Sequence, residues 1–155
     1  MNPASAPLGP VHHVGISVLD IERSIRFWRD LVGVASRDRS TLDGPLVGRL
    51  VGYPGVRIER CWIDLPGGLA LELLQYLDRD DAPYPPGTAH PGNVHVCLQV
   101  DEMAPAYGHA LACGAEPVGG PILVPAGPTA GARIAYLRDP DGVTIELVQP
   151  APRAA

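Results

Sequence analysis

The sequence predicts an α+β fold made of two tandem βαβββ modules, and three observations support this prediction. Two eleven-residue stretches, 65–75 and 139–149, carry Pro, Gly, Glu, Leu and Gln at the same positions. An alternating, strand-like segment with a histidine lies upstream of each stretch. In between, each copy has an Asp and a Gly thirteen residues apart, which bracket a helix-like pattern. The chain is therefore interpreted as a duplicated module.

Composition and charge limit the possible classes of protein. With 155 residues, 46% hydrophobic and 19% charged, the chain fits one compact domain or two small modules that share a core. No apolar run approaches the ~20 residues that span a bilayer, and residues 1–10 lack the apolar region of an export signal, so we expect a cytoplasmic protein without a membrane partner. The net charge of -5 argues against a nucleic-acid partner. Cys61, Cys97 and Cys113 form no C-x-x-C pair and are expected to be reduced thiols.

In the first module, strands are expected at residues 11–18, 34–37, 56–65 and 69–76. Asp20 is a plausible N-cap of a helix that Gly33 ends in the left-handed conformation. Residues 40–55 contain four glycines and two prolines and are interpreted as an irregular crossover. Pro66-Gly67-Gly68 is expected to form the turn of a hairpin.

The second module repeats this order. Strands are expected at residues 93–100, 115–118, 132–137 and 143–149. The helix is expected at 101–114, starting a residue or two late because of Pro105, and residues 119–131 are expected to form a Gly/Pro-rich loop. The predicted organisation is an N-terminal arm (1–10), a first module (11–77), a linker (78–92), a second module (93–150) and a tail (151–155).

Four side chains stand out because each lies on the strand face opposite a run of aliphatic residues: His13, Glu72, His95 and Glu146. A single strand histidine or glutamate is more often structural, but the same pair at the same offset in both copies favours a metal site. Two imidazoles and two carboxylates suit a divalent ion of intermediate softness. His12 shares its face with the aliphatic residues and is interpreted as structural.

These motifs resemble the vicinal oxygen chelate superfamily, which includes glyoxalase I, methylmalonyl-CoA epimerase, fosfomycin- and bleomycin-resistance proteins and extradiol dioxygenases. The resemblance covers residues 11–150, and its motifs are His13-Val14-Gly15-Ile16-Ser17-Val18, Phe27-Trp28, Glu72-Leu73-Leu74, the strand from His95 to Asp101, Asp139-Pro140-Asp141-Gly142 and Glu146-Leu147. It implies a glyoxalase-like fold in which the two modules form an incomplete barrel. Inside, His13, Glu72, His95 and Glu146 would bind one divalent ion: Zn, Ni, Co, Mn or Fe. Homodimers are common in the family, so a homodimer is expected.

The set of four ligands resembles the glyoxalase I and epimerase branch, which implies a lyase, isomerase or epimerase acting on a small molecule with vicinal oxygens. The expected reaction is proton transfer through a metal-stabilised enediolate, with Glu146 as ligand and base and with Glu72 or Glu59 as the second acid or base. Substrate specificity is expected from residues 40–55 and 119–131. Four residues are candidate anchors for an anionic substrate group: Arg49, Tyr53, Arg57 and Arg133.

Two alternatives remain open. One is an extradiol-type ring-cleaving dioxygenase, in which three ligands hold the metal and the position of Glu72 is not a ligand. The other is a metal-independent antibiotic-binding resistance protein. Residues that bind glutathione in glyoxalase are not recognisable, so glutathione is not expected as a cosubstrate.

Overall fold

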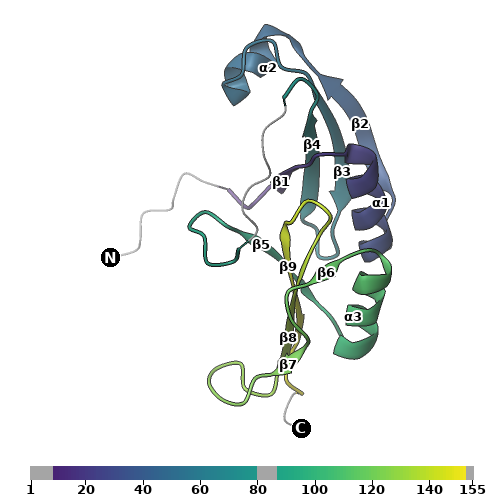
Figure 1. Cartoon of the computed structure of the whole chain (residues 1–155), viewed down its shortest axis with the longest axis vertical. Coiled ribbons are helices and arrows are strands. Elements are labelled where there is room, and N and C mark those ends of the chain that lie inside the picture. The colour runs from purple at the N-terminus through teal and green to yellow at the C-terminus, as the bar shows by residue number, and fades with distance from the viewer. Residues whose placement is uncertain (1–8, 80–86, 153–155) are drawn as a thin grey trace.

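The structure is a computed structural model that describes residues 9–79 and 87–152. It contains two sheets, and the helices at residues 21–32 and 103–112 lie along the same side of them (Figure 1). The first sheet has the strand order β1 (His13–Ser17), β4 (Ala70–Tyr76), β3 (Ile58–Asp64), β2 (Ser36–Leu42). The second has the order β5 (His95–Gln99), β9 (Thr144–Gln149), β8 (Arg133–Arg138), β6 (Glu116–Pro117), and β7 (Ile122–Leu123) also pairs with β8. The helices are α1 (Ile21–Val32), α2 (Gly44–Val51) and α3 (Met103–Ala112). Within the described residues the strands do not close into a barrel, and the predicted α+β fold of two modules is confirmed.

The two modules share one topology. In each, the first strand pairs in parallel with the last one, β1 with β4 and β5 with β9, and the last strand pairs antiparallel with the strand before it. The aliphatic faces of both sheets pack under the helices: Leu71, Leu73, Ile145 and Leu147 are buried in one hydrophobic cluster. Burying each such side chain contributes about 1.5–3 kcal/mol to folding. The two modules therefore share one core, and the opposite sheet faces carry the predicted ligands.

Helix α1 begins and ends where the sequence predicts. The Asp20 side chain accepts a hydrogen bond from the Arg23 backbone N–H, and Gly33 ends the helix at φ 70. Helix α3 begins at Met103, which agrees with the late start expected from Pro105. The two helices meet at their C-terminal ends, where His109 Nε2 lies 3.0 Å from the Asp30 carbonyl oxygen. His109 thus links the modules although its side chain is exposed.

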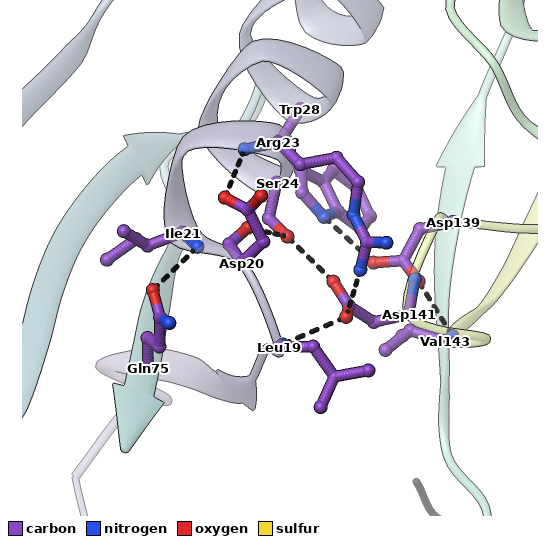
Figure 2. Close-up of polar contacts among 10 residues, drawn as sticks. All are labelled: Leu19, Asp20, Ile21, Arg23, Ser24, Trp28, Gln75, Asp139, Asp141 and Val143. Atoms are coloured by element: carbon purple, nitrogen blue, oxygen red, sulfur yellow. Dashed lines mark hydrogen bonds and ion pairs between the residues drawn. The ribbon is translucent and has the colours of Figure 1, made fainter. Parts of the chain in front are cut away.

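A polar contact joins the turn between β8 and β9 to the start of α1 (Figure 2). Asp141 accepts hydrogen bonds from the Leu19 N–H at 2.9 Å, from Arg23 Nη2 at 2.5 Å and from the Ser24 hydroxyl at 2.7 Å. Asp139 accepts one from Trp28 Nε1 at 3.2 Å and others from the N–H groups of its own turn. Carboxylates of the second module thereby accept hydrogen bonds from α1 and from the residue before its N-cap in the first module.

Three features differ from the sequence-based expectation. Residues 40–55 are not irregular throughout, because α2 forms at Gly44–Val51, with Pro45 in its first turn and Gly52 as its left-handed end. Strand β2 extends to Leu42, past a register shift between Arg37 and Ser40. The segment 119–131 contains the two-residue strand β7. Residues 1–8 of the predicted arm, 80–86 of the predicted linker and 153–155 of the predicted tail lie outside the described residues.

No helix in residues 9–79 and 87–152 is long and apolar enough to span a membrane.

Candidate metal and substrate site

The first predicted pair, His13 and Glu72, is brought together by the parallel strands β1 and β4. In the β1–β4 register, Gly15 lies beside Glu72. His13 is two residues before Gly15 and therefore projects from the same face of the sheet. His13 Nε2 lies 3.2 Å from Glu72 Oε2, and the two side chains are 35% and 15% exposed. The Glu72 carboxylate is therefore mostly buried against the sheet, while the His13 imidazole remains accessible to solvent.

The second pair, His95 and Glu146, repeats this arrangement on β5 and β9. Here Cys97 lies beside Glu146, as Gly15 lies beside Glu72 in the first sheet. His95 Nε2 lies 2.9 Å from Glu146 Oε2, with exposures of 44% and 14%. The duplication read from the sequence thus extends to side-chain geometry.

The four predicted ligands form two separate pairs in this chain. Among residues 9–79 and 87–152, no group of three or more His, Cys, Asp or Glu side chains is close enough to hold a metal ion. The expectation that one chain gathers all four into one set is therefore not met by this conformation. The physical reason is that the pairs lie on different sheets, and β1 and β5 do not pair with each other.

Each pair has a donor set and spacing that suit a metal ion. Two adjacent ligands about 2.1 Å from an ion, at about a right angle, lie about 3 Å apart. The Nε2–Oε2 distances of 3.2 Å and 2.9 Å agree with this separation. Each pair thus fits as half of a binding site with nitrogen and oxygen ligands.

An aromatic residue accompanies each pair, and sequence reasoning missed both. Trp62 lies opposite Glu72 in the β3–β4 register, and Tyr136 lies opposite Glu146 in the β8–β9 register. The Trp62 ring meets His13 edge to face, with centroids 5.1 Å apart, and the Tyr136 ring meets His95 at 5.7 Å. The repeat could have identified them, because each aromatic residue lies ten residues before the glutamate of its hairpin.

The two glutamates have different polar neighbours. Glu146 lies beside the Tyr136 hydroxyl and the Cys97 thiol, and burial, followed by the charge of Glu146, raises the pKa of both groups. Both therefore stay protonated at neutral pH and donate hydrogen bonds to the carboxylate. Glu72 instead has a cation, since Arg60 Nη1 lies 3.6 Å from Glu72 Oε1.

Glu59, the other predicted acid or base, lies on the opposite face of its sheet. Because Trp62 is opposite Glu72, the odd-numbered residues of β3 face the helix side. There Glu59 pairs with Arg39, whose guanidinium also pairs with Glu22 of α1. Glu59 is thus part of a structural ion-pair network.

Other expectations about single residues are also resolved. His12 does not lie under the helix: it is exposed, and its Nδ1 lies 2.8 Å from His13 Nδ1. The candidate anchor Arg57 is paired with Asp78 at 3.1 Å. Arg49 and Arg133 lie at the surface.

A cleft of about 830 Å³ lies between the two sheets. Its walls include residues 14–18, which comprise most of β1 and the residue after it, and residues 92–96 at the start of β5, together with Tyr53 and the β8–β9 turn. Because consecutive residues of both strands line it, the cleft follows unpaired strand edges rather than a sheet face. His95 lines this cleft, whereas His13, Glu72 and Glu146 do not.

Comparisons with known proteins agree with the fold and the motifs. The sequence profile of the Glyoxalase/Bleomycin resistance protein/Dioxygenase superfamily matches residues 12–136, which include His13, Glu72 and His95. The chain is 28% identical over 144 residues to a probable lactoylglutathione lyase of Vibrio parahaemolyticus serotype O3:K6, covering 91% of each. It is 26% identical over 142 residues to a 2-epi-5-epi-valiolone epimerase of an Actinomyces species, covering 89% of this chain and 78% of the epimerase.

A solved structure supports the same fold. A glyoxalase family protein from Bacillus cereus superposes with a TM-score of 0.78 at 23% identity, covering 96% of this chain and 99% of that one. Because the superfamily profile matches well over half of the sequence, the chain belongs to the glyoxalase/bleomycin resistance protein/dioxygenase superfamily.

Proposed function

We propose that the protein is a divalent-metal-dependent lyase, isomerase or epimerase that moves a proton on a small substrate with vicinal oxygens. The observation that carries this proposal is the repeated His–Glu pair, with Nε2–Oε2 distances of 3.2 Å and 2.9 Å at equivalent positions of two sheets. The names of the two curated relatives, a lyase and an epimerase, support the same reaction class.

We propose that His13, Glu72, His95 and Glu146 bind the ion and that a second copy of the chain completes the set. One protomer would supply His13 and Glu72, and its partner His95 and Glu146, because the single chain holds these pairs apart. A bound ion supplies Lewis-acid polarisation of the substrate oxygens. The homodimer is thus part of the proposed active unit.

The two glutamates are assigned different roles. Glu146 is proposed to take and return the substrate proton, since its neighbours Tyr136 and Cys97 are uncharged hydrogen-bond donors that orient the carboxylate. Glu72 is proposed to serve as a ligand, with its second oxygen facing Arg60. Glu59 is proposed to have no role in the reaction, a proposal supported by its ion pair with Arg39 on the helix side of the sheet.

Metal binding tests the proposal. Protein stripped with a chelator and titrated with Zn²⁺ in a calorimeter is expected to bind about one ion per chain. Glu72→Gln and Glu146→Gln are each expected to weaken binding by roughly 100-fold or more, since removal of even an outer-shell partner typically costs 10–100-fold. Glu59→Gln makes the same change of charge on the other face of the sheet and is the matched control. Wild-type affinity in Glu146→Gln, or an equal loss in Glu59→Gln, would contradict the proposal.

A further inference from the structure

Arg60 lies on the face of the first sheet that carries the His13–Glu72 pair. Trp62 is opposite Glu72 in the β3–β4 register, and Arg60 is two residues from Trp62, so both project from that face. In the neighbouring row, Arg60 lies between Leu74 of β4 and Ser40 of β2. A guanidinium is therefore positioned directly beside a proposed metal ligand.

The contacts of Arg60 leave much of its hydrogen-bonding capacity unused. Its Nη2 donates to the Ser40 hydroxyl at 3.1 Å, and its guanidinium lies 5.7 Å from the Trp62 ring centroid. The carboxylate contact with Glu72 is long, at 3.6 Å, and the buried Nε–H has no acceptor among the described residues. The side chain is 28% exposed, so solutes can reach it from the sheet face.

Other arginines of the first module are closely paired with carboxylates. Arg37 contacts Asp64 at 2.8 Å and Asp38 at 2.7 Å. Arg39 contacts Glu59 at 2.8 Å, and Arg57 contacts Asp78 at 3.1 Å. Arg60 differs because its carboxylate neighbour is the side chain expected to share its charge with a metal ion.

The second module has no cation at the equivalent position. The row that corresponds to Ser40, Arg60 and Leu74 consists of Ile122, Ile134 and Val148. Arg138 lies on the same face of the second sheet but in a different row, beside Thr144, so a cation at the row of Arg60 is specific to the first module. In a site built from both faces, the row of Arg60 would therefore correspond to an aliphatic row in the second module.

We propose that Arg60 binds an anionic group of the substrate, a carboxylate or a phosphate, next to the metal ion. This inference rests on the proposed function, because an ion bound to Glu72 would take up part of the carboxylate charge, and the remaining donors of the guanidinium would then be available to the substrate. Arg60 presents a planar fork of donors that matches the two oxygens of such a group. The substrate class is therefore narrowed to vicinal-oxygen compounds that carry a separate negative charge.

A pair of probes with equal shape and different charge tests this inference. The acid 3,4-dihydroxybenzoate and its neutral amide both present vicinal oxygens on the same ring. Their affinities for Zn²⁺-loaded and metal-free protein are measured by calorimetry for wild type, Arg60→Ala, Arg60→Lys and Arg57→Ala. Arg57→Ala removes an equal charge three residues away and is the matched control, and thermal unfolding followed by circular dichroism establishes that each variant is folded.

Wild type is expected to bind the acid roughly tenfold more tightly than the amide, as for a charge-assisted hydrogen bond. Arg60→Ala should remove this preference and change the affinity for the amide by no more than about twofold. Arg60→Lys should keep part of the preference for the acid, and Arg57→Ala should keep all of it. Equal affinities in wild type, or an equal loss for both probes in Arg60→Ala, overturn the inference while the metal site stands. If neither probe binds the Zn²⁺-loaded protein more tightly than the metal-free protein, the proposed function fails and the inference with it.

Discussion

Asp139 shows how a single buried carboxylate makes stability depend on pH. Only 2% of the residue is exposed, and burial raises its pKa even though Trp28 and the backbone of its own turn donate to it. The folded protein therefore holds this proton at higher pH than the unfolded chain does. By linkage, the contribution of Asp139 to the free energy of unfolding falls as pH rises from about 4 through its folded pKa.

Asp139→Asn is expected to change this pH dependence. The amide nitrogen would face Trp28 Nε1, donor against donor, and the lost hydrogen bond should lower the free energy of unfolding by about 1–3 kcal/mol at pH 4. The deficit should shrink toward pH 7, because wild type then carries a buried charge that the variant lacks. Urea denaturation of wild type and Asp139→Asn at pH 4, 5.5 and 7 measures this difference in the free energy of unfolding. Asp101→Asn, at an exposed carboxylate, is the control, and a deficit that grows with pH would contradict the argument.

At the same scale, the proposed ligands were predictable from sequence and their neighbours were less so. His13, Glu72, His95 and Glu146 were identified because repetition distinguishes them from solitary polar residues. The position of Glu59 required the strand register, since a shift of one residue exchanges the two faces of a strand. The register is set by the turn and by packing against the helix, which no local pattern around Glu59 reveals.

At the scale of elements, the sequence predicts those whose signals are local. Helix α1 has an N-cap, a spaced apolar face and a left-handed glycine, and the structure confirms each of them. Helix α2 is not predicted, because the four glycines and two prolines of residues 40–55 favour an irregular segment. Pro is favoured in the first turn of a helix, so Pro45 was in fact compatible with its start. Strand β2 lacks alternation because most of its residues are exposed.

Replacing Gly48 tests whether the close contact between α2 and the loop that follows it requires a glycine. Replacing an exposed helical glycine by alanine normally stabilises a protein by about 0.5–1 kcal/mol. A Cβ at Gly48 would instead lie 3.0 Å from the Tyr53 carbonyl oxygen and 3.1 Å from Pro54 Cα, both backbone atoms of the returning loop. Gly48→Ala is therefore expected to lower the free energy of unfolding by about 1 kcal/mol or more.

Gly108 of α3 provides the control for this measurement. A Cβ there would meet no atom within 4 Å, so Gly108→Ala should show the ordinary stabilisation of about 0.5–1 kcal/mol. Chemical denaturation of both variants compares the two helices directly. Equal stabilisation by the two substitutions would mean that the loop after α2 moves away at little cost.

At the scale of the whole molecule, duplication was predictable and the separation of the two pairs was not. The distance between the His13–Glu72 and His95–Glu146 pairs depends on how the edges of two sheets lie relative to each other. That placement results from contacts between distant segments, such as Asp141 with Ser24 and His109 with Asp30. The local sequence around these residues does not reveal which distant segment each of them contacts. The sequence therefore predicts both halves of the site and not their arrangement.

Subunit complementation decides whether one metal site is shared between two chains. Glu72→Gln disables the first half of the site and Glu146→Gln the second, so each homodimer lacks a ligand at every site and should bind Zn²⁺ weakly. In a heterodimer of the two variants, purified through two different affinity tags, one site joins two disabled halves and the other joins two intact halves. About one ion per dimer should then bind with wild-type affinity. If each site were formed within one chain, the heterodimer would bind as weakly as the homodimers, because every chain would still lack one carboxylate.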